Sequence, residues 1–200
     1  RAMANTKQVK GADVFNNGFS TAPAYVGGDG VAFFSASHPT VSGGIQSNVA
    51  AASDLSEAAL ETIITNIQKI KDDRNILIGS SAVSLHIPPD LWSTADQILH
   101  SPGSTVAGGT GDGTYAQNNI NAIRHMGMIP EGFFVNRRFT DTNNYYIKTD
   151  VPNGAKMFVR VPLQTKMEPD FDTGNLRFKA RERYSFGFSD WRSYFGSQGS

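Results

Sequence analysis

The chain has 200 residues, with 18 Lys and Arg against 18 Asp and Glu, so its formal net charge is zero. Its 39% of hydrophobic residues is enough for a folded core, which excludes a chain that is disordered throughout. Neutrality argues against a dedicated nucleic-acid binder, whose affinity normally rests on excess Lys and Arg. The absence of Cys excludes disulfides, thiolate metal sites and a Cys nucleophile.

We expect neither a membrane-spanning helix nor a signal peptide within this sequence. No apolar run approaches the ~20 residues of a membrane-spanning helix, and residues 1–7 lack the apolar stretch of a signal peptide. We therefore expect no membrane partner. Apolar side chains already recur at helical spacing from Ala2 to Phe15, so we expect the chain to begin inside a helix, either because a longer precursor was trimmed or because the given sequence starts late.

Three elements are predicted in the first third. The opening helix should end near Asn16–Gly18, because Asn and Gly tolerate the left-handed conformation that closes helices. Val31–Phe34 predicts a short strand, and residues 35–52 read as a loop. The clearest helix runs from Leu55 to Lys71, with Asp54 as its expected cap and Glu57 completing a capping box.

The middle third alternates strands with a helix and then a loop. Residues 75–79 and 83–87 predict strands, and Pro88-Pro89-Asp90 opens a second helix because Pro suits a first helical turn. Residues 101–119 are rich in Gly, Ser and Thr and predict a mobile loop.

The last third changes to the period of β-structure. Short strands are predicted at 132–135 and 145–147, and a longer one at 155–167, with a turn at 170–175. In the partner strand that follows, apolar residues alternate with Arg177, Lys179, Arg181 and Arg183. These four charges suit contact with nucleic acid, solvation, or pairing with the carboxylates of another element, and neutrality favours the carboxylates over nucleic acid.

The sequence offers little for catalysis. Its four His residues lack metal-binding spacing, so we expect no metal and no cofactor. A hydrolase that uses His38, His86 or His125 with a Ser stays open, although no G-x-S-x-G elbow is present.

The C-terminal segment is rich in aromatic residues, which is unusual for a chain end. Aromatic residues and Arg are favoured at the centres of protein interfaces, so this segment covers either its own core or the edge of a neighbouring subunit. The candidates for subunit contacts are Trp191, Arg192, Tyr194, Phe195, Arg181 and Arg183.

Several stretches stand out in this order: Asp29–Pro39, Ser47-Asn48 before Leu55–Leu60, Ile87–Leu99, Asn119–Asn121 and Phe186–Arg192. Taken together, they resemble the major capsid (head) proteins of tailed bacteriophages, most closely the Mu-type head subunit group with the HK97-like fold. The resemblance covers nearly the whole chain, and the order of the stretches from end to end is moderately specific.

The resemblance implies an α+β fold of the HK97-like type. Its axial lobe has helices around a small sheet, and its peripheral lobe has a long helix and a long β-hairpin. Residues 1–48 would hold the end of the spine helix and linking segments, 49–135 the axial-type lobe, and 136–200 the peripheral-type hairpin and C-terminal segment. Such subunits normally have an N-terminal arm and an extended loop ahead of the spine helix, and their presence before residue 1 stays open.

The implied function is structural and non-enzymatic: a major capsid subunit that self-assembles into the icosahedral head shell around double-stranded DNA. The implied partners are copies of the chain in hexamers and pentamers, other phage head proteins and, weakly and non-specifically, packaged DNA. The implied location is the virion, after assembly in the host cytoplasm. The alternatives are a non-catalytic phage or bacterial binding module of glycan or adhesin type and, less favoured, the Ser/His hydrolase.

Overall fold

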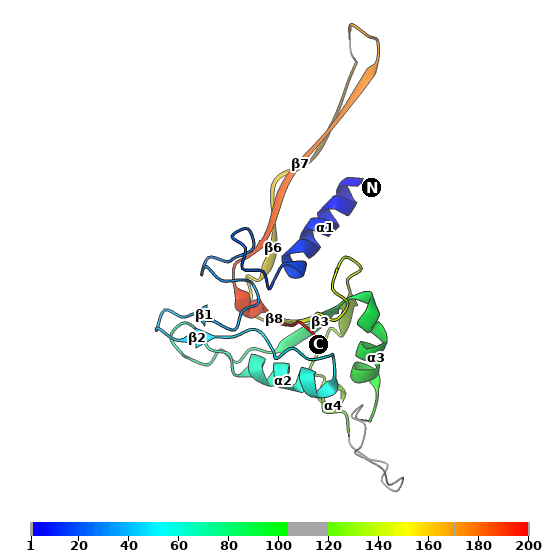
Figure 1. Ribbon diagram of the computed structural model, residues 1–200. Helices are drawn as coiled ribbons and strands as arrows, with labels where there is room; N and C mark the ends of the chain where they lie inside the picture. Colours follow the sequence, from blue (N-terminus) through cyan, green and yellow to red (C-terminus); the bar gives the residue numbers. More distant parts are fainter. Residues whose placement is uncertain (1, 104–119, 170, 200) are drawn as a thin grey trace.

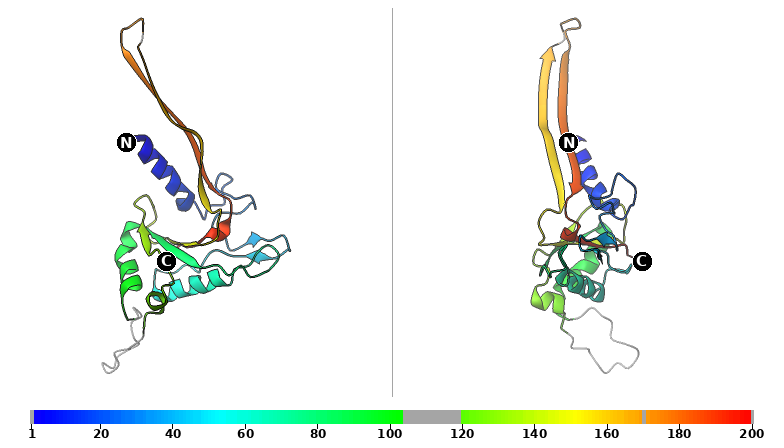
Figure 2. Two further views of the ribbon diagram at one scale, coloured as in Figure 1. Left: turned by 180° about the vertical axis from the view of Figure 1, so that it is seen from behind. Right: turned by 90° about the vertical axis from the view of Figure 1, so that its left-hand side faces the viewer.

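A computed structural model describes residues 2–103, 120–169 and 171–199 of the chain. It has two contrasting regions, a folded body and a long β-hairpin that extends away from it (Figure 1). Helix α1 (Ala2–Asn16) lies beside the hairpin and leads from the N-terminus down to the body. Both views in Figure 2 show the far end of the hairpin standing clear of the body.

The body is built on a four-stranded sheet with the strand order β4-β3-β5-β8. Strand β3 pairs in parallel with β4 and antiparallel with β5, and β5 pairs antiparallel with β8. The last strand of the chain therefore completes the sheet of the body. The strands are β3 (Ala82–Ile87), β4 (Phe133–Val135), β5 (Tyr145–Thr149) and β8 (Tyr194–Ser197).

Three helices cover the body. Helix α2 (Glu57–Gln68) buries Leu60, Ile63 and Ile67, whose spacing of three and four residues places them on one face. Helix α3 (Trp92–His100) follows a 3-10 turn, η1 (Pro89–Leu91), and packs against the short helix α4 (Ala122–Met126). None of the described helices is long and apolar enough to span a membrane.

The lower end of α1 is fixed to the body by aromatic rings. The Phe15 ring lies 5.0 Å from that of Tyr194 and 5.4 Å from that of Tyr146, measured between centroids. The Tyr146 hydroxyl donates a hydrogen bond to the Phe15 carbonyl oxygen at 3.1 Å. Strands β5 and β8 of the sheet thus hold the end of the helix.

The hairpin consists of β6 (Ala155–Pro169) and β7 (Leu176–Phe188). Its pairing shifts between Val159 and Val161 and again before Gln164. Apart from these irregularities, alternate residues of each strand face opposite sides. The side that carries Tyr184 and Phe186 of β7 packs against α1.

Contacts between α1 and β7 identify the residues of β7 that face α1. Lys7 of α1 forms an ion pair with Glu182 and lies over the Tyr184 ring, at 5.3 Å from its centroid. Further down, Gly11 approaches Phe186 so closely that a Cβ would lie 3.3 Å from the ring. The even-numbered residues of β7 therefore face α1, and the odd-numbered residues face away from it.

The structure confirms most of the predicted elements and corrects four. Residues 31–34 and 75–79 form only isolated bridges, Val26 to Ala32 and Lys71 to Leu77. The cap of α2 is Ser56, whose side chain accepts from the Ala59 N–H, in place of Asp54. Within the predicted loop 35–52, β1 (His38–Pro39) pairs with β2 (Ile45–Gln46). Helix α4 was not predicted, because five residues are too few to show helical periodicity.

Most of the predicted loop 101–119 lies outside the described residues, which resume at Ile120.

Candidate subunit-contact surfaces

The C-terminal segment is held in the body of its own chain. Asp190 caps a 3-10 turn, η2 (Trp191–Ser193), by accepting from the Arg192 N–H at 3.0 Å, and β8 follows directly. Trp191 is 7% exposed and Phe195 2% exposed. The body's own core therefore accounts for the burial of both rings.

Trp191 stacks on a buried histidine. The rings of Trp191 and His38 are nearly parallel, with centroids 4.1 Å apart and 4° between the planes. His38 Nδ1 lies 2.6 Å from Asp29 Oδ2, and its Nε2 lies 3.1 Å from Asn48 Oδ1. Both ring nitrogens face side-chain oxygens. No described Ser hydrogen-bonds to the ring, so these contacts indicate a structural His.

Asn48 joins three segments of the body. Its amide nitrogen lies within hydrogen-bond distance of the carbonyl oxygens of Phe33, Trp191 and Tyr194, at 2.8, 3.1 and 3.0 Å. Its Oδ1 accepts from the Ser35 N–H at 2.9 Å. A fully buried amide that meets this many partners fixes the C-terminal segment against the N-terminal third.

Arg192 extends the same network towards the surface. Its guanidinium lies 4.6 Å from the centroid of the Trp191 ring, and it pairs with Asp73 Oδ1 at 2.5 Å. Its Nε donates to the Lys71 carbonyl oxygen at 3.1 Å. Arg192 is 9% exposed, and its described hydrogen bonds and ion pairs are with residues of its own chain.

The histidines give no hydrolytic site. His86 Nε2 lies 3.2 Å from Ser84 Oγ, but no described carboxylate hydrogen-bonds to its other ring nitrogen. Burial, with the nearby charge of Lys148 as a lesser cause, lowers the pKa of His86 to about 4. His125 is exposed on α4, and the described residues contain no group of three His, Asp or Glu that could hold a metal.

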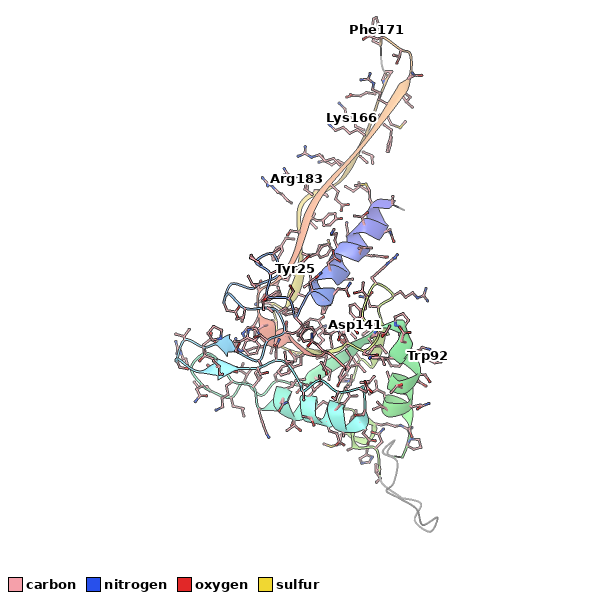
Figure 3. All side chains as sticks on the ribbon, viewed as in Figure 1. Tyr25, Trp92, Asp141, Lys166, Phe171 and Arg183 are labelled. Atoms are coloured by element: carbon pink, nitrogen blue, oxygen red, sulfur yellow. The ribbon has the colours of Figure 1, made fainter. Side chains whose placement is uncertain are left out.

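The predicted contact residues thus fall into two places. Trp191, Arg192 and Phe195 are buried in the body, and Tyr194 is half-buried beside the Phe15 ring. Arg181 and Arg183 are exposed on the hairpin, on the side away from α1, where Figure 3 labels Arg183. Contact with a second subunit stays a prediction for all six residues.

The hairpin also exposes apolar side chains that the sequence reading did not single out. On its α1-facing side, beyond the residues that α1 covers, Met167 is 58% exposed, Phe178 64% and Leu176 65%. Phe171 at the turn is fully exposed, and Figure 3 shows it at the far end of the molecule. The alternation of apolar and basic residues in β7 could have predicted these exposed apolar side chains. One side of the strand stays apolar farther than the 15-residue helix α1 can cover.

Comparison with known proteins identifies a family for the chain. No curated protein matches the chain. A solved structure described as the capsid of an empty GTA particle computed with C5 symmetry is similar, with a TM-score of 0.45 and 15% sequence identity. That match covers 99% of this chain and 65% of the other, so this chain spans less than two thirds of its length.

The sequence profile of a family described as phage capsid protein matches residues 1–195, nearly the whole chain. This match confirms the prediction of a capsid protein that the sequence stretches suggested. On this finding, the chain belongs to the phage capsid protein family.

Proposed function

We propose that the chain is the major subunit of a phage head, which self-assembles into an icosahedral shell around double-stranded DNA. Membership of a capsid family makes the protein structural rather than enzymatic. It therefore favours neither a glycan-binding or adhesin module nor a Ser/His hydrolase. The HK97-like fold of the Mu-type group is part of the proposal, and the stretches named in the sequence analysis support it.

The observation that carries the proposal is the hairpin. It stands outside the body, and its α1-facing side continues past α1 with exposed Phe178, Leu176 and Met167. Contiguous exposed apolar surface of this kind marks sites of protein association. A chain that buried all its apolar surface in one body would lack such a feature, whereas a shell subunit needs edges that fit its neighbours.

The body and the hairpin suit the two lobes of such a subunit. We assign residues 49–135 to an axial-type lobe and 136–200 to a peripheral-type hairpin and C-terminal segment, with 1–48 as the end of the spine helix and linking segments. The four-stranded sheet takes β3 and β4 from the first of these ranges and β5 and β8 from the last. The last range therefore contributes two strands to the sheet of the body as well as the hairpin.

The proposed partners are copies of the same chain in hexamers and pentamers, together with other phage head proteins. Contact with packaged DNA is proposed to be weak and non-specific, because the net charge of zero supplies little attraction for phosphates. The proposed location is the virion, with assembly in the host cytoplasm.

The test is particle formation by the full-length protein. The purified protein is concentrated and followed by light scattering and negative-stain electron microscopy. We expect rings or icosahedral shells. A protein that stays monomeric at high concentration would contradict the proposal.

A further inference from the structure

The side of the hairpin that faces away from α1 is a second, chemically different surface. Its β7 residues are Arg177, Lys179, Arg181 and Arg183, and the pairing places Glu168, Lys166, Gln164 and Val161 opposite them on β6. We call these eight residues the basic face. Glu168 is its only carboxylate, and it pairs with Lys166.

The basic face is electrostatically unfavourable in the isolated chain. Lys166 and Lys179 lie directly opposite each other, and like charges in that arrangement destabilise a strand pair. Lys179, Arg181 and Arg183 are exposed and form no ion pair with any described residue. These three exposed charges are therefore available to an external partner.

The rest of the chain carries the opposite charge. Residues 155–188 contain seven of the 18 Lys and Arg but only four of the 18 Asp and Glu, which leaves eleven basic and fourteen acidic residues elsewhere. In the body, α2, η1 and α3 together expose Glu61, Asp90 and Asp96, while Glu57 is buried, and these elements contain not one Lys or Arg. The neutral chain is therefore divided into a basic hairpin and an acidic remainder.

We propose that the basic face binds carboxylates on a second copy of the chain. This inference rests on the proposed function, because it names the partner surface of a self-assembling subunit. Complementary charge on a single chain favours head-to-tail association, in which one copy offers its hairpin and the next its acidic surface. DNA is the competing partner. The excess positive charge of the hairpin is balanced by acidic residues elsewhere on the same chain, and this balance favours a second copy of the chain over a polyanion.

Charge reversal on the basic face tests the proposal in the full-length protein. The variant Lys179→Glu, Arg181→Glu, Arg183→Glu changes three exposed side chains. The matched control Arg74→Glu, Arg124→Glu, Arg137→Glu changes the net charge equally at exposed positions that form no described ion pair. Circular dichroism and thermal unfolding confirm that both variants fold.

We expect the basic-face variant to associate about ten-fold or more weakly than the wild type in sedimentation, since several ion pairs are lost together. The control should associate within about three-fold of the wild type. Raising the salt concentration should weaken the association of the wild type, because salt screens exposed charges. It should therefore also reduce the difference in association between the wild type and the basic-face variant. Equal loss in both variants, or no loss in the basic-face variant, would overturn the proposal.

Zero-length carbodiimide crosslinking provides a second measurement, because it joins a Lys amine to a carboxyl group only in direct contact. A mixture of isotopically light and heavy chains separates links between copies from links within one copy. We expect Lys166 or Lys179 to be joined to a carboxylate of another copy. Links confined to single chains, such as Lys166 to Glu168, would contradict the proposal.

The outcomes separate this inference from the proposed function. If the wild type does not assemble, the proposed function fails. If wild type and basic-face variant assemble equally well, only the inference fails. A variant that assembles normally but loses binding to a short DNA duplex would assign the basic face to DNA and overturn the inference.

Discussion

The body and the hairpin hold their aromatic residues in opposite ways. In the body, Phe33, Tyr145 and Phe195 are between 0% and 2% exposed, although they come from distant parts of the chain. On the outer hairpin, Phe178 is 64% exposed and Phe171 fully exposed. Burial of an aromatic side chain stabilises the fold, whereas exposure leaves that free energy available for association. The same residue type thus serves folding in one region and, on our proposal, assembly in the other.

The largest effect is expected for the body's tryptophan. Trp191→Ala removes a ring that is 7% exposed and that stacks on His38, so it should lower the free energy of unfolding by about 3–5 kcal/mol. Urea denaturation measures the change. The matched control is Trp92→Ala on α3, where the ring is 58% exposed and the expected change is within about 0.5 kcal/mol. Similar losses at the two sites would break the comparison of buried and exposed rings.

His86 makes the stability of the body depend on pH. Because burial lowers its pKa to about 4, from a value near 6.5 in the unfolded chain, the unfolded chain binds the proton first as the pH falls. The contribution of the neutral ring is complete above pH 6.5 and is lost between 6.5 and 4. The loss should be on the order of 2–3 kcal/mol.

The measurement compares wild type with His86→Gln by urea denaturation at pH 7 and at pH 4.5. Carboxylates titrate in both proteins, so the difference between them isolates His86. We expect the wild type to lose more stability than the variant over this interval. An identical pH dependence would show that His86 is accessible to solvent in the folded body.

The sequence predicted the regular elements of both regions better than it predicted the contacts that hold the segments of the body together. Helix α2 and the hairpin strands were predictable because their apolar residues recur at a fixed period. The contacts of Asn48 with Phe33, Trp191 and Tyr194 were not, since they join residues up to 146 positions apart. Nothing in local periodicity encodes such contacts.

The sequence analysis also did not predict that aromatic residues are buried in a segment without regular secondary structure. Phe33 and Phe34 were expected in a strand, but they are buried in an irregular segment, where Phe33 stacks on Phe188 with centroids 4.2 Å apart. Their burial agrees with their hydrophobicity, because Phe is among the residue types most often buried. Strand geometry additionally requires a partner edge, which the fold does not provide there.

Two adjacent tyrosines in β5 offer a smaller effect of opposite sign. The Tyr145 hydroxyl is buried and has no described hydrogen-bond partner, whereas the Tyr146 hydroxyl donates to the Phe15 carbonyl oxygen. Tyr145→Phe should leave the free energy of unfolding unchanged or raise it by up to about 1 kcal/mol. Tyr146→Phe should lower it by about 1 kcal/mol. Equal losses for both would indicate that a bound water satisfies Tyr145.

The smallest effect on folding is expected on the hairpin. Phe178 is 64% exposed and lies beyond the part of β7 that α1 covers, so Phe178→Ala should change the free energy of unfolding of the 200-residue chain by less than about 0.5 kcal/mol. Phe188→Ala, on the same strand and the same side, removes a ring stacked on Phe33 and should cost several times more. Urea denaturation of both variants gives the ratio. If Phe178 contributed as much as Phe188, the outer hairpin would belong to the cooperative core, and its apolar side would no longer argue for association.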